Sequence, residues 1–160
     1  MAQLMLNLAK SIPELHFLYK TRQHPDVDKM LSGDPPESMD QHMRYMDAVQ
    51  DKTRWIYIAS IRDDVKNNEF LVGYSHIYDV TEKTVTVGFT IHPEKQGNGY
   101  GKDLVIKTIS KAKEKFPDKK LILSVLRNNS KAIHIYKKLG FVEKNTAIED
   151  FEKMHMELCE

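Results

Sequence analysis

Three glycines at alternate positions, Gly97, Gly99 and Gly101, separate two different periodic patterns in this chain. Residues 84–91 alternate with a period of two, which predicts a strand. Apolar residues after Gly101 recur at helical spacing, which predicts a helix from near Gly99 to about Lys115. Such a junction leaves backbone N–H groups free at the first helical turn, where they and the helix dipole bind a phosphate or pyrophosphate. The simpler alternative is a glycine-rich turn without a ligand.

Two familiar nucleotide-binding motifs do not match this stretch. A P-loop has four residues between its first glycine and Gly-Lys-Ser/Thr, whereas Gly101-Lys102 is followed by Asp103. A dinucleotide-binding motif reads Gly-x-Gly-x-x-Gly, and here the third glycine comes one position too early. The stretch instead has the form Gln-x-x-Gly-x-Gly, read at Gln96, Gly99 and Gly101.

The composition limits the possible classes of protein. A length of 160 residues fits one domain with its own core, so we expect a single domain over residues 1–160. Lys and Arg total 24 against 23 Asp and Glu, and this balance gives no reason to expect a nucleic acid or a membrane surface as partner. The single Cys159 cannot form an intramolecular disulfide, which favours the cytoplasm. The apolar run in residues 1–10 is too short for a signal peptide.

The first half of the chain predicts a strand, helices and a three-stranded antiparallel unit. A strand over residues 2–8 precedes a helix that Ser11 caps, and a short helical piece surrounds Val27. A helix from residue 36 or 37 to Gln50 carries methionines at helical spacing, which we expect to pack on the sheet. Strands follow at residues 54–61, 69–78 and 84–92. We expect one shared face for Trp55, Tyr57, Ala59 and Ile61, and another for Phe70, Val72, Tyr74, His76 and Tyr78.

The second half alternates strands and helices. A nearly continuous apolar run at residues 121–126 predicts a strand covered on both faces. A helix then begins at Asn128 or Asn129 and ends at Gly140, and strands follow at residues 141–144 and 151–158. This order predicts an α+β, or layered α/β, architecture with helices on a mixed sheet.

A second motif stands about 30 residues after Gly99. Residues 129–141 read Asn-Ser-Lys-Ala-Ile-His-Ile-Tyr-Lys-Lys-Leu-Gly-Phe, which matches Asn-x-x-Ala-x-x-x-Tyr-x-x-x-Gly-Phe at every fixed position. Together with the glycine motif and the order of elements, it resembles the GNAT family of N-acetyltransferases. The resemblance implies a mostly antiparallel central sheet flanked by helices, acetyl-CoA as cofactor, and acetyl transfer to a primary amine by direct attack through a tetrahedral intermediate. It also makes a homodimer an expectation.

The resemblance assigns roles to individual residues. Strands 84–92 and 121–126 would diverge and admit the pantetheine arm, which would bond to the backbone of Phe89, Ile91 and His92. One of these N–H groups would also stabilise the oxyanion. Tyr136 would be the general acid that protonates the departing thiolate, although an aromatic side chain on that helix face also fits a purely structural core position. The other cofactor-binding residues would be Gln96, Gly97, Asn98, Gly99, Tyr100, Gly101 and Lys102 around the pyrophosphate, and Asn129 at the cofactor arm.

The general base is where this chain departs from the family pattern. An alkyl amine with a pKa of ~10.4 must lose a proton before it attacks a thioester. Many relatives place a Glu where Thr86 stands here, and Thr cannot act as a base at neutral pH. A chain of water molecules is one alternative. The candidate side chains are Glu69, His76, Asp79, His92 and His134.

The acceptor site is expected near Arg22-Gln23-His24-Pro25-Asp26. This segment resembles bacterial enzymes that acetylate a UDP-linked 4-amino sugar on the pseudaminic acid route, although those usually carry Trp where Thr21 stands. That resemblance implies a nucleotide-sugar acceptor, with Arg22, His24 and His42 holding its diphosphate. A local Arg22–Asp26 pair is the structural alternative.

Two other functions stay open from the sequence. The acceptor is a peptide or protein α-amine, or a polyamine, if acidic groups such as Asp26 and Asp28 attract a cation. The missing Glu also permits a non-catalytic domain that senses acyl-CoA. The sequence contains no pattern that predicts a metal site.

Overall fold

One sheet organises the chain, and its fold class is the one predicted. The computed structural model describes residues 2–31, 33–146 and 150–159. In those residues a seven-stranded sheet runs in the order β1-β2-β3-β4-β5-β7-β6, and its one parallel pair is β4 with β5. The elements are β1 (Ala2–Leu8), α1 (Ile12–Gln23), α2 (Pro25–Asp28), α3 (Met39–Val49), β2 (Trp55–Asp63), β3 (Asn68–Tyr78), β4 (Thr84–Ile91), the 3-10 helix η1 (Pro93–Lys95), α4 (Tyr100–Lys115), β5 (Lys120–Leu126), α5 (Ser130–Lys138), β6 (Phe141–Glu143) and β7 (Lys153–Leu158).

Side-chain caps decide where two of the helices begin. Ser11 Oγ accepts from the Glu14 N–H at 3.3 Å and Glu14 Oε1 accepts from the Ser11 N–H at 2.9 Å, which confirms the predicted start of α1. Helix α3 begins two or three residues later than predicted, because Ser38 Oγ accepts from the Gln41 N–H at 3.1 Å. In the part of the chain that the structure describes, no helix combines the length and apolar character needed to cross a bilayer.

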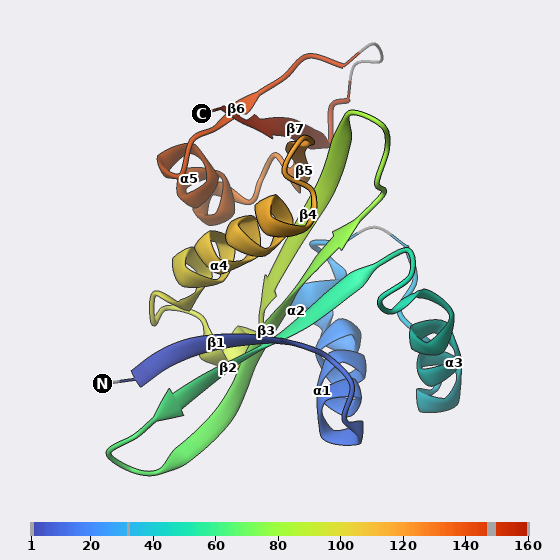
Figure 1. Cartoon of the computed structure of the whole chain (residues 1–160), viewed down its shortest axis with the longest axis vertical. Coiled ribbons are helices and arrows are strands. Elements are labelled where there is room, and N and C mark those ends of the chain that lie inside the picture. The colour runs from blue at the N-terminus through green and yellow to red at the C-terminus, as the bar shows by residue number, and fades with distance from the viewer. Residues whose placement is uncertain (1, 32, 147–149, 160) are drawn as a thin grey trace.

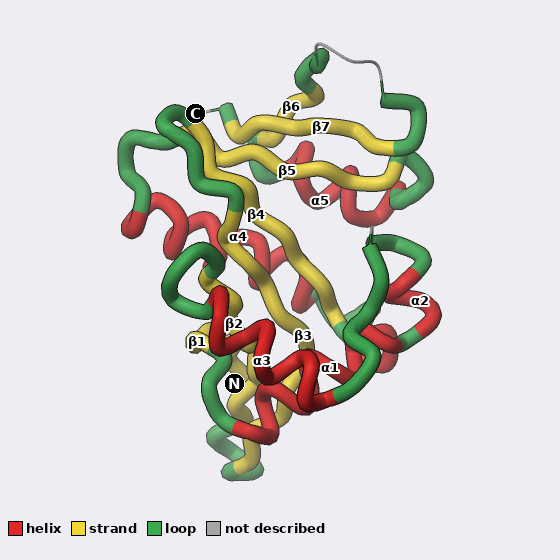
Figure 2. Tube along the Cα trace, turned by 90° about the vertical axis from the view of Figure 1, so that its right-hand side faces the viewer, coloured by secondary structure: helices red, strands yellow, loops and turns green. Residues whose placement is uncertain are grey.

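Helices cover both faces of the sheet (Figures 1 and 2). Helices α4 and α5 lie on one face, over a large core that includes Val85, Leu104 and Phe141. Helix α1 and helix α3 lie on the other face, over a smaller core with Leu18 and Met46. Since Met46 is 3% exposed, the methionine stripe of α3 contributes to packing as predicted.

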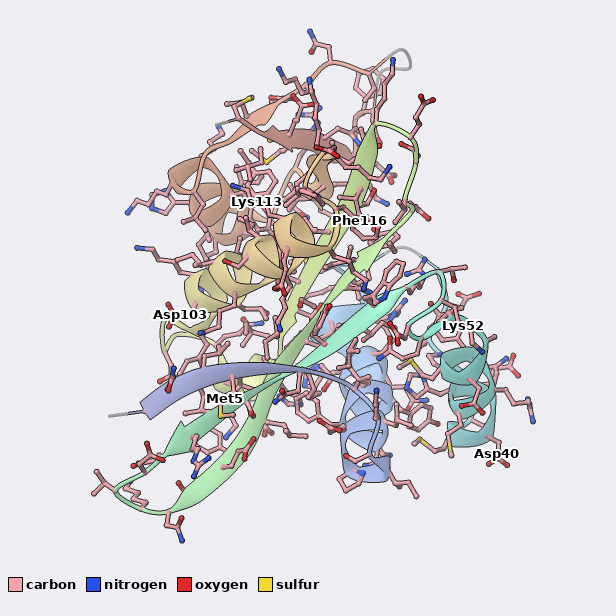
Figure 3. All side chains as sticks on the ribbon, in the orientation of Figure 1. Met5, Asp40, Lys52, Asp103, Lys113 and Phe116 are labelled. Atoms are coloured by element: carbon pink, nitrogen blue, oxygen red, sulfur yellow. The ribbon has the colours of Figure 1, made fainter. Side chains whose placement is uncertain are left out.

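Helix α4 begins at the glycine loop and runs across one face of the sheet, where it packs on β1, β3 and β4 (Figure 1). Asp103 lies in its first turn and Phe116 directly follows its last (Figure 3). The Phe116 ring meets the ring of Trp55 edge-on, with centroids 5.4 Å apart. The buried residues of α4 include Leu104, Val105 and Ala112. Full burial of a Leu or Val side chain stabilises a fold by about 1.5–3 kcal/mol.

A bulge in β3 overturns one prediction about the sheet. Ala59 pairs with Gly73 and Ser60 with Leu71, so Val72 is an extra residue without a partner on β2. The bulge exchanges the two faces of β3 at this point. Phe70 and Val72 therefore pack in the core under α4, whereas Tyr74 packs with α1 and α3. The predicted single face from Phe70 to Tyr78 is wrong, although the predicted face of β2 is confirmed.

Gly73 provides a test of this close strand packing. A Cβ on Gly73 would lie 2.2 Å from the Thr90 carbonyl oxygen and 3.0 Å from Ile91 Cα, both backbone atoms of β4. We expect Gly73→Ala to lower the free energy of unfolding by about 3 kcal/mol, because the strands must separate locally. Denaturant unfolding measures the change.

Gly101→Ala is the matched control for that substitution. Gly101 lies inside helix α4, and a Cβ added to it would make an ordinary 3.5 Å contact with Ile135 Cδ1 of α5. We expect a change between zero and a stabilisation of about 1 kcal/mol, since Ala is the better helix former. Equal unfolding free energies for both variants would contradict the packing described here.

Candidate functional site

The site lies where β4 and β5 separate. The two strands pair over three residues each, from Thr84 with Lys120 to Thr86 with Ile122, and no pairing continues beyond these in the described residues. A cleft of about 690 Å³ opens at that point. Strands β3, β4, β5 and β7, helices α2, α4 and α5 and the glycine loop contribute to its walls. The lining residues include Val87, Gly88, Phe89 and Ile91 of β4, Ser124 and Leu126 of β5, Gly97 to Lys102 except Asn98 from the loop and α4, and Asn129 and Tyr136 at α5.

The exposed backbone edge of β4 faces this cleft. The His92 N–H donates to the Val72 carbonyl at 2.8 Å, so His92 bonds toward β3. In an antiparallel pair the bonding direction alternates, so Phe89 and Ile91 direct their N–H and C=O groups the other way, toward β5. That is the arrangement predicted for Phe89 and Ile91. The His92 carbonyl also accepts from the Lys95 N–H at 2.8 Å, so the backbone of His92, unlike the prediction, is engaged within the fold.

The glycine loop leaves the first turn of α4 open. Gly97 and Gly99 have φ values of 83° and 81°, and a Cβ on either residue would meet no atom within 4 Å. Gly99 is the N-cap of α4, and no side chain accepts from the first N–H groups of the helix. These donors and the positive end of the helix dipole, with Lys102 beside them at the cleft, are suited to bind an anion.

Gln96 and Asn98 hold the loop in shape. Gln96 Nε2 donates to the Ile91 carbonyl at 3.1 Å, which ties the loop to the end of β4. Asn98 Nδ2 donates to the Lys95 carbonyl at 3.1 Å, and Asn98 does not line the cleft. The structure therefore gives both residues a role within the loop. Gln96, Tyr100, Gly101 and Lys102 also border the cleft.

Helix α5 places two polar groups at the other wall. Asn129 Oδ1 accepts from the Ala132 N–H at 3.3 Å, which caps the helix and leaves the side-chain amide at the cleft. Tyr136 is 8% exposed, and its ring lies 5.6 Å from that of Phe89 and 5.9 Å from that of Phe141. Burial raises the pKa of Tyr136, so the phenol keeps its proton at neutral pH. A protonated phenol that lines the cleft is suited to act as an acid.

The candidate bases separate into two groups. His76 and His134 line the cleft, whereas Glu69, Asp79 and His92 do not. Glu69 accepts instead from Ser60 Oγ at 2.7 Å. Burial and the nearby Arg54 charge lower the pKa of His76 to about 4, so its imidazole is neutral and only weakly basic at pH 7. Its ring lies over Gly88 and beside the ring of Tyr78, with centroids 5.4 Å apart.

The three residues predicted to hold a diphosphate lie elsewhere. Arg22 Nη1 donates to Asp28 Oδ1 and Nη2 to the Gly33 carbonyl, both at 2.7 Å, so Arg22 fastens the segment after α2. His24 Nδ1 caps α2 by accepting from the Asp26 N–H at 3.1 Å. His42 is 6% exposed and faces Tyr19 between α1 and α3. None of the three lines the cleft in the part of the chain that the structure describes.

Other residues also reach the cleft, and of these only Asp26 was considered from the sequence, as an acidic group that attracts a cation. Asp26, Val27, Met30 and Leu31 come from α2 and the turn after it. Tyr78 comes from β3, and Lys131 and Lys153 add positive charge. Ser124 had a signal in the sequence, because it is the one polar residue within the apolar run 121–126.

Comparisons with known proteins agree on the family. A family model described as an acetyltransferase (GNAT) domain matches residues 6–142. The spermidine N(1)-acetyltransferase of Vibrio cholerae is 24% identical over 141 residues, which are 86% of this chain and 79% of that protein.

Two solved structures share the fold. The crystal structure of spermidine N-acetyltransferase from Vibrio cholerae in complex with CoA and spermine matches with a TM-score of 0.83 and 22% identity, over 98% of this chain and 95% of that one. A domain from Methanocaldococcus jannaschii matches with a TM-score of 0.81 and 18% identity, over 99% of both chains. Since the family model spans most of the sequence, this chain belongs to the GNAT family of acetyltransferases.

Proposed function

We propose that the cleft between β4 and β5 binds acetyl-CoA, and that the protein transfers the acetyl group to a small primary amine of the polyamine class. The observation that carries this proposal is the separation of β4 and β5 beside an uncapped helix N-terminus and a protonated Tyr136. Acetyl transfer needs an anion site, an extended backbone edge and an acid in one cleft, and these residues supply all three.

The residues fit the parts of acetyl-CoA. The first N–H groups of α4, with Gly97, Gly99 and Lys102, would hold the pyrophosphate. The free backbone edge at Phe89 and Ile91 would bond the pantetheine amides in the manner of an added strand. When bound, acetyl-CoA supplies the activated acetyl group.

The protein's own groups would then handle charge and protons. A backbone N–H of β4 that points into the cleft stabilises negative charge on the acetyl oxygen, because it is fixed in place before the reaction. Tyr136 keeps its proton at neutral pH and can give it to the departing sulfur. These roles make the sensor alternative less economical, since a sensor has no use for an acid in the cleft.

A polyamine acceptor has more support than a nucleotide sugar. The spermidine enzyme of Vibrio cholerae aligns with 86% of this chain. Asp26 lines the cleft, and its 3.1 Å ion pair with Lys29 is exposed on both sides, so a bound cation can replace Lys29 at little cost. Arg22 and His42, the groups expected to hold a sugar diphosphate, are engaged or buried away from the cleft. A peptide α-amine is the other acceptor that the cleft admits.

A panel of amines tests the acceptor. Thiol release from acetyl-CoA is measured with the full chain and spermidine, spermine, butylamine, an N-terminal peptide and a UDP-linked 4-amino sugar. We expect kcat/KM for the polyamines to exceed that for the other amines at least tenfold. A polyamine carries a second ammonium group, which can pair with Asp26 while the first amine is acetylated. Preferred turnover of the peptide or the sugar would contradict the polyamine class, and binding of coenzyme A without turnover of any amine would favour a sensor.

A pair of glycine variants tests the pyrophosphate site. Gly99 and Gly33 have similar φ values of 81° and 84°, and a Cβ on either meets no atom within 4 Å, but only Gly99 lines the cleft. We expect Gly99→Ala to weaken coenzyme A binding about tenfold or more, equal to about 1.4 kcal/mol, because the new methyl occupies the anion's space. Calorimetry measures both dissociation constants.

Gly33→Ala controls for backbone strain in that comparison. It should cost similar folding stability and leave coenzyme A affinity within about twofold, a difference below about 0.5 kcal/mol. Equal weakening by both substitutions would mean that the loop is not the pyrophosphate site.

A further inference from the structure

A serine, a histidine and an aspartate form a hydrogen-bonded row on the sheet face away from α4 and α5. Ser124 of β5 pairs directly with His155 of β7. Ser124 Oγ lies 3.0 Å from His155 Nδ1, and His155 Nε2 lies 3.0 Å from Asp150 Oδ2. Leu123 and Met156, their neighbours along the strands, are buried in the core under the helices, so Ser124 and His155 face the opposite side.

Asp150 is fixed in position by its surroundings. Its Oδ1 accepts from the N–H groups of Lys153 at 2.9 Å and Glu152 at 3.0 Å. Arg127 Nε and Nη2 donate to its carbonyl oxygen at 3.2 and 3.1 Å. The Lys153 N–H is the main cause that lowers the pKa of Asp150, and His155 lowers it further. The carboxylate is therefore ionised at neutral pH and only accepts hydrogen bonds.

This fixes the direction of the whole row. Because Asp150 Oδ2 only accepts, His155 Nε2 carries the proton and donates to it. In the neutral imidazole Nδ1 is then unprotonated, so it accepts from the Ser124 hydroxyl. The remaining lone pairs of Ser124 Oγ are left for another donor. A hydroxyl, an imidazole that accepts its proton and a carboxylate that orients the imidazole can together remove a proton from a bound group.

Ser124 lies where β4 and β5 begin to diverge. Ser124 stands two residues beyond Ile122, the last residue of β5 that pairs with β4 in the described residues. Ser124 and Tyr136 both line the cleft, and Ser124 is exposed. The serine hydroxyl therefore opens into the cleft that contains the acid.

We propose that Ser124, His155 and Asp150 form the proton relay that accepts the proton of the attacking amine. This inference rests on the proposed function. The protonated amine gives one proton to Ser124 Oγ while the Ser124 proton passes to His155 Nδ1. Asp150 stabilises the imidazolium, which then releases this proton to solvent. The neutral amine nitrogen bonds to the acetyl carbon, the carbon–sulfur bond breaks, and the departing sulfur receives a proton from Tyr136. The proton that the nitrogen loses in this second step returns to the Tyr136 oxygen.

Charged side chains from β7 and from the elements packed beside it surround His155. Lys153 and Glu157 lie two residues to either side on the same face of β7. Glu157 Oε2 lies 3.9 Å from Lys120 Nζ on β5 and 3.8 Å from Lys144 Nζ after β6. Arg127 pairs with Glu143 at 3.0 Å, and Tyr136 lines the cleft from α5. Asp150 is the carboxylate in contact with the ring.

The pH dependence of turnover tests the relay in the full chain. We expect Ser124→Ala and His155→Gln to lower kcat/KM about 100-fold at pH 7, the range of general-base contributions. The loss should shrink to less than about fivefold near pH 10, where an amine of pKa ~10.4 deprotonates without help. Asp150→Asn should show the same trend with a smaller loss, and Ser124→Thr, which keeps the hydroxyl, should restore turnover.

Glu157→Gln is the control, because it changes a charge on the same face of β7 without touching the row. Its pH profile should follow that of the unaltered chain. Turnover of Ser124→Ala and His155→Gln within twofold of the unaltered chain at pH 7, or a loss that is equal at every pH, would overturn the relay.

Measurements on the same proteins distinguish a nucleophilic Ser124 and an inactive protein from a failure of the relay alone. A protein that gains the mass of one acetyl group from acetyl-CoA without an amine, and loses this gain in Ser124→Ala, would make Ser124 a nucleophile and overturn the relay. If the unaltered chain acetylates no amine, the proposed function fails and the relay fails with it. If the unaltered chain is active and the variants are unaffected, only the relay fails.

Discussion

The site depends on the point at which β4 and β5 stop bonding to each other, after Thr86 and Ile122. Beyond it, the backbone groups of Phe89 and Ile91 face the cleft without a strand partner. The Ile91 carbonyl accepts from Gln96 Nε2. An unpaired peptide group removed from water costs about 1–3 kcal/mol, so an extended ligand that carries amides is favoured at the other backbone groups of this edge. Helices on one face of the sheet support the strands on both sides of this separation. Helix α4 packs on β3 and β4, and helix α5 packs on α4 and β6.

Much of the fold was predictable because apolar periodicity and caps are local signals. The order of elements and the glycine loop are confirmed on that basis. The β3 bulge was not predictable, because an inserted residue such as Val72 keeps the alternating pattern and only the pairing with β2 reveals it. The contacts of Arg22 were also not predictable from the sequence. A guanidinium beside a histidine and a proline suits a phosphate, but Arg22 finds Asp28 and the Gly33 carbonyl first.

The proposed relay could not be predicted from the sequence, because its residues lie far apart in the chain. Ser124 and His155 are separated by 31 positions, and only the antiparallel register of β5 and β7 makes them neighbours. The chain has Thr86 at the position of the usual family carboxylate, and the proposed relay approaches the same cleft from β5. Donor recognition thus follows from short local motifs, whereas proton handling follows from strand pairing.

Tyr136→Phe tests the central claim most directly. The substitution removes one oxygen and keeps the ring between Phe89 and Phe141. If the cleft holds acetyl-CoA with Tyr136 as the acid, kcat should fall by at least about 100-fold. The dissociation constant for coenzyme A should stay within about twofold, less than about 0.5 kcal/mol. An unchanged kcat, or a loss of coenzyme A binding that matches the loss of kcat, would contradict the account.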